Sequence, residues 1–296
     1  MSLLNTLKYV TNHPLNKNQK AQAVCRFLKW QIGSRLLPGK VVYTWINGAK
    51  IIISPGETAL TGNLYCGLYE FTDMAFLLHV LRKEDLFVDV GANVGSYTIL
   101  ACASVGARGY CIEPVPSTYL RLMDNIRLNN LIGNVECLNI GLGDEKGIAR
   151  FTSNRNCTNH VLKEGENTYD EITVRMDTLD SVLKNKSPFI IKVDVEGYEN
   201  KILKGAQRVL SNESLQSLII ETDDRNSGCD SDHTSISELM NDFGFHKYTY
   251  DPFNRELTIP RHDKNNSNNT IYIRNKDIIL DRIKHARYMT IHDIDI

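Results

Sequence analysis

Carboxylates recur in this sequence at the points where short apolar runs end. These acids are Asp89, Glu113, Asp144, Asp194, Glu196 and Glu221. A carboxylate beside a protein core is costly unless it is paired or binds a ligand. Open α/β sheets bind ligands at the edge where the carboxyl ends of their parallel strands meet. We therefore expect these acids to surround one ligand site.

A glycine-rich turn follows the first acid, in the segment Asp89-Val-Gly-Ala-Asn-Val-Gly95. Gly91 and Gly95 permit positive φ and let a ligand approach the main chain closely. A helix expected directly after the turn would add free N–H groups and the positive end of its dipole. Asp89 adds a fixed negative charge, so the site suits a zwitterionic or cationic ligand better than a pyrophosphate. Asn93 also stands where a dinucleotide motif needs a bare glycine.

Glu113 closes the next expected strand, 24 residues after Asp89. An acid at that place can accept hydrogen bonds from the two vicinal hydroxyls of a ribose. The alternative is a helix N-cap or a surface acid. Because dinucleotide sites share this geometry, Glu113 by itself indicates only an adenosyl-type ligand.

Alternating strand and helix patterns from Leu86 onward predict an α/β fold with a parallel sheet and right-handed crossovers. The expected strands are 87–90, 109–112, 135–140, 189–193 and 218–220, and the expected helices are 97–104, 117–129, 198–210 and 236–243. Further strands are expected at 148–151, 172–175, 245–250 and 271–274. The tail is expected to be partly disordered.

The first 60 residues are expected to form an extension of helices and a hairpin. Helical periodicity covers residues 1–36, and Asn47-Gly48 is a strong type I′ turn signal within 41–54. We expect an amphipathic cap packed on the main domain, with membrane or partner binding as the alternative. Residues 56–67 are expected to be a loop.

Composition argues against several classes of function. The chain has 296 residues, of which 42% are hydrophobic and 23% charged, and a net charge of −1. This balance gives no global attraction to nucleic acid, so we expect no nucleic-acid partner. No apolar run approaches the roughly 20 residues that span a bilayer, and no secretory signal pattern is recognisable. Seven cysteines without a CxxC pair indicate reduced thiols, no zinc site and a cytoplasmic location.

The segments Asp89–Thr98, Glu113-Pro114, Gly141–Asp144 and Lys192–Glu199, the last reading K-V-D-V-E-G-Y-E, together resemble the FkbM family of S-adenosylmethionine-dependent methyltransferases. The resemblance covers roughly residues 65–275. It implies a class I methyltransferase Rossmann-like fold: a seven-stranded, mostly parallel sheet with helices on both faces and the seventh strand inserted antiparallel. The expected division is then an extension over 1–60, the methyltransferase domain over 61–280 and a tail over 281–296.

The resemblance also assigns contacts to the cofactor S-adenosylmethionine. The glycine turn and Asp89 would receive the carboxylate and ammonium of its methionine part, Glu113 its ribose, and the segment from Gly141 its adenine. A plain hairpin turn is the alternative for that last segment. The expected cofactor contacts are Glu70, Asp89, Gly91, Asn93, Gly95, Tyr97, Thr98, Glu113, Gly141, Leu142, Asp144 and Asp194. Glu70 is included because a helix over 69–81 would start near the glycine turn, although a solvated side chain is the alternative.

Candidate catalytic residues follow from the reaction that the family implies. Methyl transfer is an in-line displacement, and an alcohol acceptor must also lose its proton. Asp194 is the first choice for contacting the acceptor or serving as base, and Glu196 is the second. His160, in a polar insertion, is a third candidate, with a solvent-exposed loop histidine as the alternative. A divalent metal held by Asp194, Glu221 and Asp223 is an alternative that we do not adopt, because no clear set of ligands is visible.

The sequence is therefore interpreted as a methyltransferase that methylates an oxygen of a sugar, a glycan or a small metabolite. A nicotinamide-dependent oxidoreductase is the first rival, and Asn93 and Asp89 argue against it. A catalytically inactive S-adenosylmethionine-binding module is the second. The acceptor itself is not readable, because its specificity is expected in loops such as 152–170 and 223–234. A homo-oligomer is left open.

Overall fold

The central sheet contains the five parallel strands that the sequence predicts. The computed structural model describes residues 2–152, 160–162, 170–222, 235–260 and 269–296. The parallel strands are β3 (Leu86–Val90), β4 (Arg108–Ile112), β5 (Val135–Leu138), β9 (Ile190–Val193) and β10 (Ser217–Glu221). They lie in the order β10-β9-β3-β4-β5, so the chain reverses its direction of winding beside β3.

The other side of the sheet is antiparallel. Strand β13 (Asn269–Ile273) pairs antiparallel with both β10 and β11 (His246–Asp251), as the family resemblance implies for the last strand. The expected sheet of seven strands has an eighth, because β12 (Glu256–Thr258) pairs with β11 as a hairpin at the edge.

Helices cover both faces of the sheet because the strands alternate between two hydrophobic clusters. Phe87 and Ile190 belong to one cluster, whereas Val88 and Ile191, their neighbours along the strands, belong to the other. The first face carries α4 (Phe71–Val80), α5 (Ser96–Ile99), α6 (Pro116–Leu128) and α11 (Lys276–Lys284), and the second carries α7 (Leu179–Leu183), α8 (Glu199–Lys204), α9 (Gln207–Leu210) and α10 (Ile236–Asp242). The fold class is therefore α/β with buried strands, as expected.

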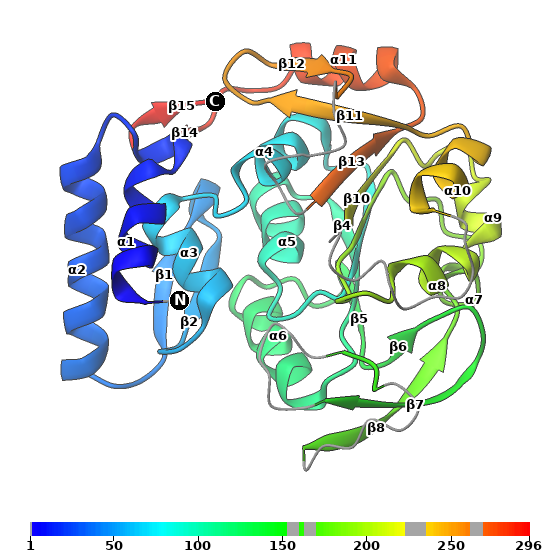
Figure 1. Cartoon of the computed structure of the whole chain (residues 1–296), viewed down its shortest axis with the longest axis horizontal. Coiled ribbons are helices and arrows are strands. Elements are labelled where there is room, and N and C mark those ends of the chain that lie inside the picture. Colours follow the sequence, from blue (N-terminus) through cyan, green and yellow to red (C-terminus); the bar gives the residue numbers. More distant parts are fainter. Residues whose placement is uncertain (1, 153–159, 163–169, 223–234, 261–268) are drawn as a thin grey trace.

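The N-terminal segment packs on the outer side of the helices that cover the first face of the sheet (Figure 1). It consists of α1 (Leu3–Asn12), α2 (Lys20–Leu36), β1 (Val41–Thr44), β2 (Lys50–Ile53) and α3 (Thr58–Cys66), with short 3-10 turns at Pro14–Asn16 and Ile46–Gly48. Val10, Phe27 and Ile51 are buried in the same cluster as Phe87, which confirms that this segment packs on the main domain. Positive φ angles at Asn47 and Gly48 confirm the predicted turn between β1 and β2.

The expected loop over residues 56–67 is wrong, since α3 occupies most of it. Gly62 lies inside this helix, where glycine is normally unfavourable. A Cβ atom built there would lie 2.3 Å from the ring of Tyr69, so the glycine makes room for that ring. This reason is tertiary and leaves no local signal.

Two elements near the site differ from the expected ones. Strand β5 ends at Leu138, and β6 (Gly141–Leu142) instead joins a separate sheet with β7 (Gly147–Thr152) and β8 (Glu171–Asp177) in the order β6-β8-β7. The helix expected over 198–210 is broken at Gly205, whose Cβ would lie 2.1 Å from the Gly143 carbonyl oxygen.

The end of the chain is ordered, contrary to expectation. It forms α11 and the short pair β14 (Thr290–Ile291) and β15 (Ile294–Asp295), with Ile291 and Ile296 buried in the main hydrophobic cluster. Across the described ranges, no helix combines the length and apolar character needed to cross a membrane.

Candidate functional site

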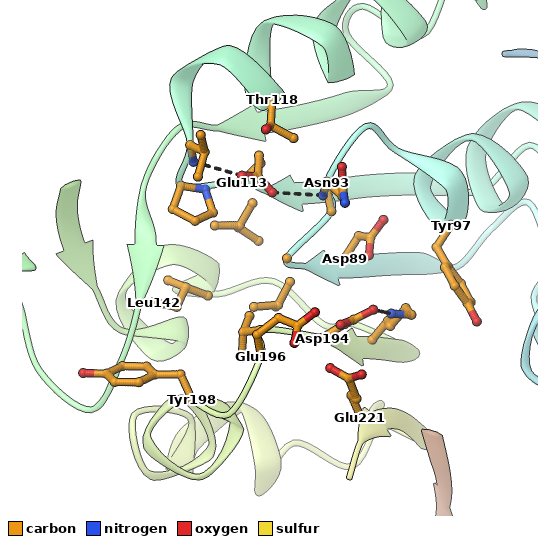
Figure 2. A pocket seen from close by; sticks show the side chains of 18 of the residues that line it. Asp89, Asn93, Tyr97, Glu113, Thr118, Leu142, Asp194, Glu196, Tyr198 and Glu221 are labelled. Atoms are coloured by element: carbon orange, nitrogen blue, oxygen red, sulfur yellow. Dashed lines mark hydrogen bonds and ion pairs between the residues drawn. The ribbon is translucent and has the colours of Figure 1, made fainter. Parts of the chain in front are cut away.

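A cavity of about 300 Å³ lies at the carboxyl ends of β3, β4, β9 and β10, and we call it the strand-end cavity. The strand-end acids that line it are Asp89, Glu113, Asp194, Glu196 and Glu221. Figure 2 shows Asp89 and Glu113 on one side, with Asp194, Glu196 and Glu221 across from them. The structure thus brings together all of the strand-end acids except Asp144.

The glycine turn is held by hydrogen bonds within the protein, contrary to the expectation of free N–H groups. The N–H groups of Gly91 and Ala92 both donate to the Ile112 carbonyl oxygen at 3.0 Å, and that of Gly95 donates to Ala92. Asn93 has a positive φ of 50° and donates its N–H to Glu113. The carbonyl that engages Gly91 and Ala92 lies at the end of β4, and this non-local contact leaves no local sequence pattern.

Gly91 is required where it stands. Its φ is +78°, and a Cβ would lie 1.8 Å from the main-chain oxygen of Asp194. The turn after β3 therefore touches the end of β9 directly.

Asp89 is buried at the end of β3, with 2% of its surface exposed. Thr98 donates its hydroxyl to Asp89 Oδ2 at 2.6 Å and is itself fully buried, so it acts on the cavity only through Asp89. Burial raises the pKa of Asp89 to about 6, although Lys192 and Thr98 oppose this rise. A cationic ligand group beside Asp89 would favour its charged form.

Glu113 is also buried, at 6% exposure, and both of its oxygens are engaged. Oε2 accepts the N–H of Asn93 at 3.0 Å, and Oε1 accepts the N–H of Val115 at 2.9 Å. Burial raises the pKa of Glu113 to about 7, and these two hydrogen bonds oppose the rise. Because each carboxylate oxygen can accept two hydrogen bonds, one position on each oxygen is left for a ligand hydroxyl.

A buried charge network lies across the cavity. The Nζ group of Lys192 donates a hydrogen bond to Asp194 Oδ2, and the same Nζ lies 4.5 Å from the centre of the Tyr97 ring. Burial alone would lower the pKa of Lys192, but Asp194, Glu70 and Asp89 raise it above its usual value. Lys192 therefore stays charged and holds Asp194 in place.

Glu221 completes this network from the end of β10. Burial and the neighbouring charge of Asp194 raise the pKa of Glu221 to about 9, so it holds a proton at neutral pH. Burial would raise the pKa of Asp194, yet Lys192 and Glu221 together lower it. Glu221 was predicted from the sequence to be a strand-end acid, but it was not among the expected cofactor contacts or catalytic residues. Its position after an apolar run was the only available signal.

The turn after β9 projects Glu196 into the cavity. Glu196 and Gly197 have successive positive φ angles of 54° and 94°. Glu199 holds this turn, because its Oε1 accepts the N–H groups of Val195 and Gly197 at 3.2 and 3.1 Å. A non-glycine residue in this conformation is strained, as residues at functional sites often are.

One further wall of the strand-end cavity is largely apolar and includes Gly141, Leu142 and Tyr198. Gly141 is closely packed, because a Cβ there would lie 2.4 Å from Met176 Sδ. Asp144 does not line the cavity and is exposed. Gly143 packs closely on Gly205, so the chain leaves the cavity before it reaches Asp144.

The remaining expected residues are placed as follows. Glu70, the N-cap residue of α4, and Tyr97 line the cavity, whereas Gly95 does not. His160 does not line it either: its main chain exchanges hydrogen bonds with Thr152, while the adjacent Val161 reaches the wall.

Only part of the alternative metal site, at Asp194, Glu221 and Asp223, lies within the described residues. Asp223 and most of the loops 152–170 and 223–234 lie outside the described residues. In the parts of the chain that are described, no group of three or more His, Cys, Asp or Glu side chains is arranged to hold a metal ion.

Comparison with known proteins identifies related methyltransferases. The "Methyltransferase FkbM domain" matches residues 89–247. The chain is 32% identical over 148 residues to the "Hexuronic acid methyltransferase AglP" of Haloferax volcanii, covering 49% of this chain and 59% of that protein. It is 25% identical over 198 residues to the "31-O-demethyl-FK506 methyltransferase FkbM" of Streptomyces tacrolimicus, covering 54% and 74%. The match to AglP thus spans less than two thirds of that relative.

Solved structures show weaker similarity. The Escherichia coli putative methyltransferase yhhF aligns with a TM-score of 0.44 and 13% identity, over 80% of this chain and 98% of that one. A putative methyltransferase from Streptococcus mutans, in complex with SAH, aligns with a TM-score of 0.37 and 12% identity, over 68% and 93%. Because the matched domain spans residues 89–247, more than half of the 296 residues, the chain belongs to the FkbM methyltransferase family.

Proposed function

We propose that this protein transfers the methyl group of S-adenosylmethionine to a hydroxyl oxygen of a sugar, a glycan or a small metabolite. The observation that carries the proposal is the pair of buried carboxylates, Asp89 and Glu113, on one wall of the strand-end cavity. The cost of burying these carboxylates is offset further when a ligand supplies additional hydrogen-bond donors or a positive charge.

The residues of the cavity fit the chemical groups of this cofactor. Asp89 and Glu70 supply negative charge for the ammonium group, and the spare positions on the oxygens of Glu113 suit the two ribose hydroxyls. Ile112 and Leu142 offer apolar surface for the adenine. The N–H groups of Gly91, Ala92 and Gly95 are already paired, so the proposal rests on the acids rather than on the turn.

Asp194 is the residue best placed to orient an acceptor hydroxyl. The cofactor supplies an electrophilic methyl group when bound. Lys192 and Glu221 hold Asp194 ionised, so it can accept a hydrogen bond from the hydroxyl and keep that oxygen aligned. A lowered pKa makes Asp194 a weak base, so alignment contributes more than proton removal. Glu196 lines the cavity and stays a candidate proton acceptor, whereas His160 does not line it and is the weaker candidate.

The acceptor class is proposed from the chemistry of the relatives. A hexuronic acid is the first acceptor to test, since the AglP relative is named for methylating one. Transfer of labelled methyl from S-adenosylmethionine to a uronic acid glycoside would measure this directly. Turnover would also exclude the rival of an inactive binding module.

Calorimetric titration distinguishes the cofactor from its rival. We expect S-adenosylhomocysteine to bind and NAD not to bind, because Asp89 would repel a diphosphate. Binding of NAD alone would contradict the proposal and favour an oxidoreductase.

Other properties stay proposals. A cytoplasmic location is supported by the free thiols of the described cysteines, Cys25, Cys66, Cys102, Cys111 and Cys137. The net charge of −1 supports the absence of a nucleic-acid partner. The division of the chain at residues 60 and 280 and a homo-oligomeric state are to be tested by limited proteolysis and light scattering.

A further inference from the structure

A second hollow, larger than the strand-end cavity, adjoins it. This hollow of about 870 Å³ lies between α1, the first turn of α4 and the strands β11 and β13, and we call it the α1 groove. Tyr69 and Glu70 line both the α1 groove and the strand-end cavity. The two hollows therefore meet at the residues that precede α4.

Buried polar groups form the inner part of the α1 groove. Asp73 is 2% exposed and Asn269 is 3% exposed, and Asn269 donates its amide to Asp73 Oδ2 at 3.1 Å. Asn269 is also the strand partner of Glu221, which lines the strand-end cavity. The buried amide of Asn269 in the α1 groove therefore lies on the strand that pairs with the Glu221 strand.

Aromatic side chains form a wall of the same groove. Tyr9 from α1 is 40% exposed and packs 5.4 Å from the ring of Tyr69, centre to centre. The Tyr9 hydroxyl donates to the Tyr69 carbonyl oxygen at 2.9 Å, which fixes the ring on the groove. Tyr248 lines the groove from β11. Tyrosine offers an apolar face and a polar edge at low conformational cost.

Charge is distributed unevenly along the groove. Lys8 is exposed, and among the described lining residues it is the only lysine or arginine. Burial lowers the pKa of His13 to about 4, so this histidine is neutral at pH 7. The acids Glu70 and Asp73 lie at the inner part, where they can accept hydrogen bonds from hydroxyl groups.

We propose that the α1 groove is the acceptor site and that it takes an acidic sugar ring. The ring's C–H face would stack on Tyr9, its carboxylate would lie near Lys8, and its hydroxyls would meet Glu70 and Asp73. The hydroxyl nearest Glu70 is the one presented to the strand-end cavity. This inference rests on the proposed function and deepens it, because it gives the N-terminal helix a role in recognising the acceptor.

The test uses the full chain and methyl β-D-glucuronoside as the probe, in the presence of S-adenosylhomocysteine. Ligand-observed NMR titration would give the dissociation constant of the glycoside. We expect Tyr9→Ala to weaken its binding about tenfold, because the stacking surface is lost. Lys8→Ala alters an exposed side chain that folding does not need, and we expect a weakening of about threefold.

Leu4→Ala is the matched control, since Leu4 lies on the same helix, is 77% exposed and does not line the groove. It should bind the glycoside as the unmodified protein does. Weaker binding in Tyr9→Ala or Lys8→Ala, but not in Leu4→Ala, supports the proposal. Unchanged binding in both variants, or no saturable binding by the unmodified protein, overturns it.

A separate calorimetric titration with S-adenosylhomocysteine tests the proposed function. Failure of the unmodified protein to bind this compound would contradict the proposed function. The glycoside titration would then test only whether the α1 groove binds an acidic sugar. Normal binding of S-adenosylhomocysteine by Tyr9→Ala would show that the variant is folded, so that a lost glycoside affinity is assigned to the groove.

Discussion

Replacing Glu113 by glutamine tests the assignment of the strand-end cavity most directly. The carboxylate is buried, and its two oxygens already hold the N–H groups of Asn93 and Val115. Glutamine has nearly the same shape, but it has one acceptor oxygen and an NH₂ group. That NH₂ group would face one of the two main-chain donors, and the ribose hydroxyls would lose their charged acceptor.

The size of the effect follows from these contacts. A hydrogen bond to a charged group contributes about 1.5–3 kcal/mol, so Glu113→Gln should weaken S-adenosylhomocysteine binding about 10- to 150-fold at pH 8. With a pKa of about 7, about nine tenths of Glu113 is ionised at pH 8 and about one tenth at pH 6. The affinity ratio between the unmodified protein and the variant should therefore shrink, by up to about tenfold, from pH 8 to pH 6.

Isothermal titration calorimetry at pH 6, 7 and 8 measures this ratio. Any titration of the ligand's own amine affects both proteins equally and cancels. Glu145→Gln, which removes the same charge from an exposed position, should bind normally at each pH. An affinity ratio near one, or a large ratio that does not change with pH, would refute the role of an ionised Glu113 in binding.

Three further predictions concern the residues around it. Asp194→Asn should lower turnover about 10²-fold, because the acceptor hydroxyl loses its alignment, while largely sparing S-adenosylhomocysteine binding. It should also lower the melting temperature because Lys192 loses its charged, buried partner; normal turnover would exclude Asp194 from orienting the acceptor. Gly91→Ala should destabilise the protein in urea unfolding by more than Gly133→Ala, whose φ is also positive but whose Cβ would meet no atom within 4 Å. Because the folded pKa of Glu221 is raised to about 9, its contribution to the free energy of unfolding is present at low pH and lost as pH rises toward 9; Glu221→Gln should flatten that decline, and an unchanged slope between pH 7 and 9 would argue against the assignment.

The parts of the fold that follow from local pattern were predictable. The run Phe87–Val90 is mostly apolar and ends in a glycine turn, so a strand of the parallel sheet could be inferred there. Acids at strand ends could be grouped for the same reason. These features depend on neighbours in sequence, and the structure places all of them except Asp144 as expected.

The rest depends on contacts between distant segments. Helix α3 was missed because Gly62 makes sense only beside Tyr69, and the paired N–H groups of the turn depend on the carbonyl of Ile112. The hydrogen bond between protonated Glu221 and Asp194 requires that β10 lie beside β9. Asp144 leaves the cavity because of Gly143 and its close packing on Gly205. None of these contacts has a signature in the local sequence.

The meeting of the two hollows at Tyr69 and Glu70 has an evolutionary consequence. The strand-end cavity is built on central strands, where a change such as one at Gly91 would disturb the core. The α1 groove is walled by β11, β13 and helix α1, and the side chains of Lys8 and Tyr9 on α1 are exposed. Related chains can therefore diverge in the walls of the groove while the strand-end cavity stays the same. We expect differences among relatives to concentrate in α1 and β11, with Glu70 retained as the junction.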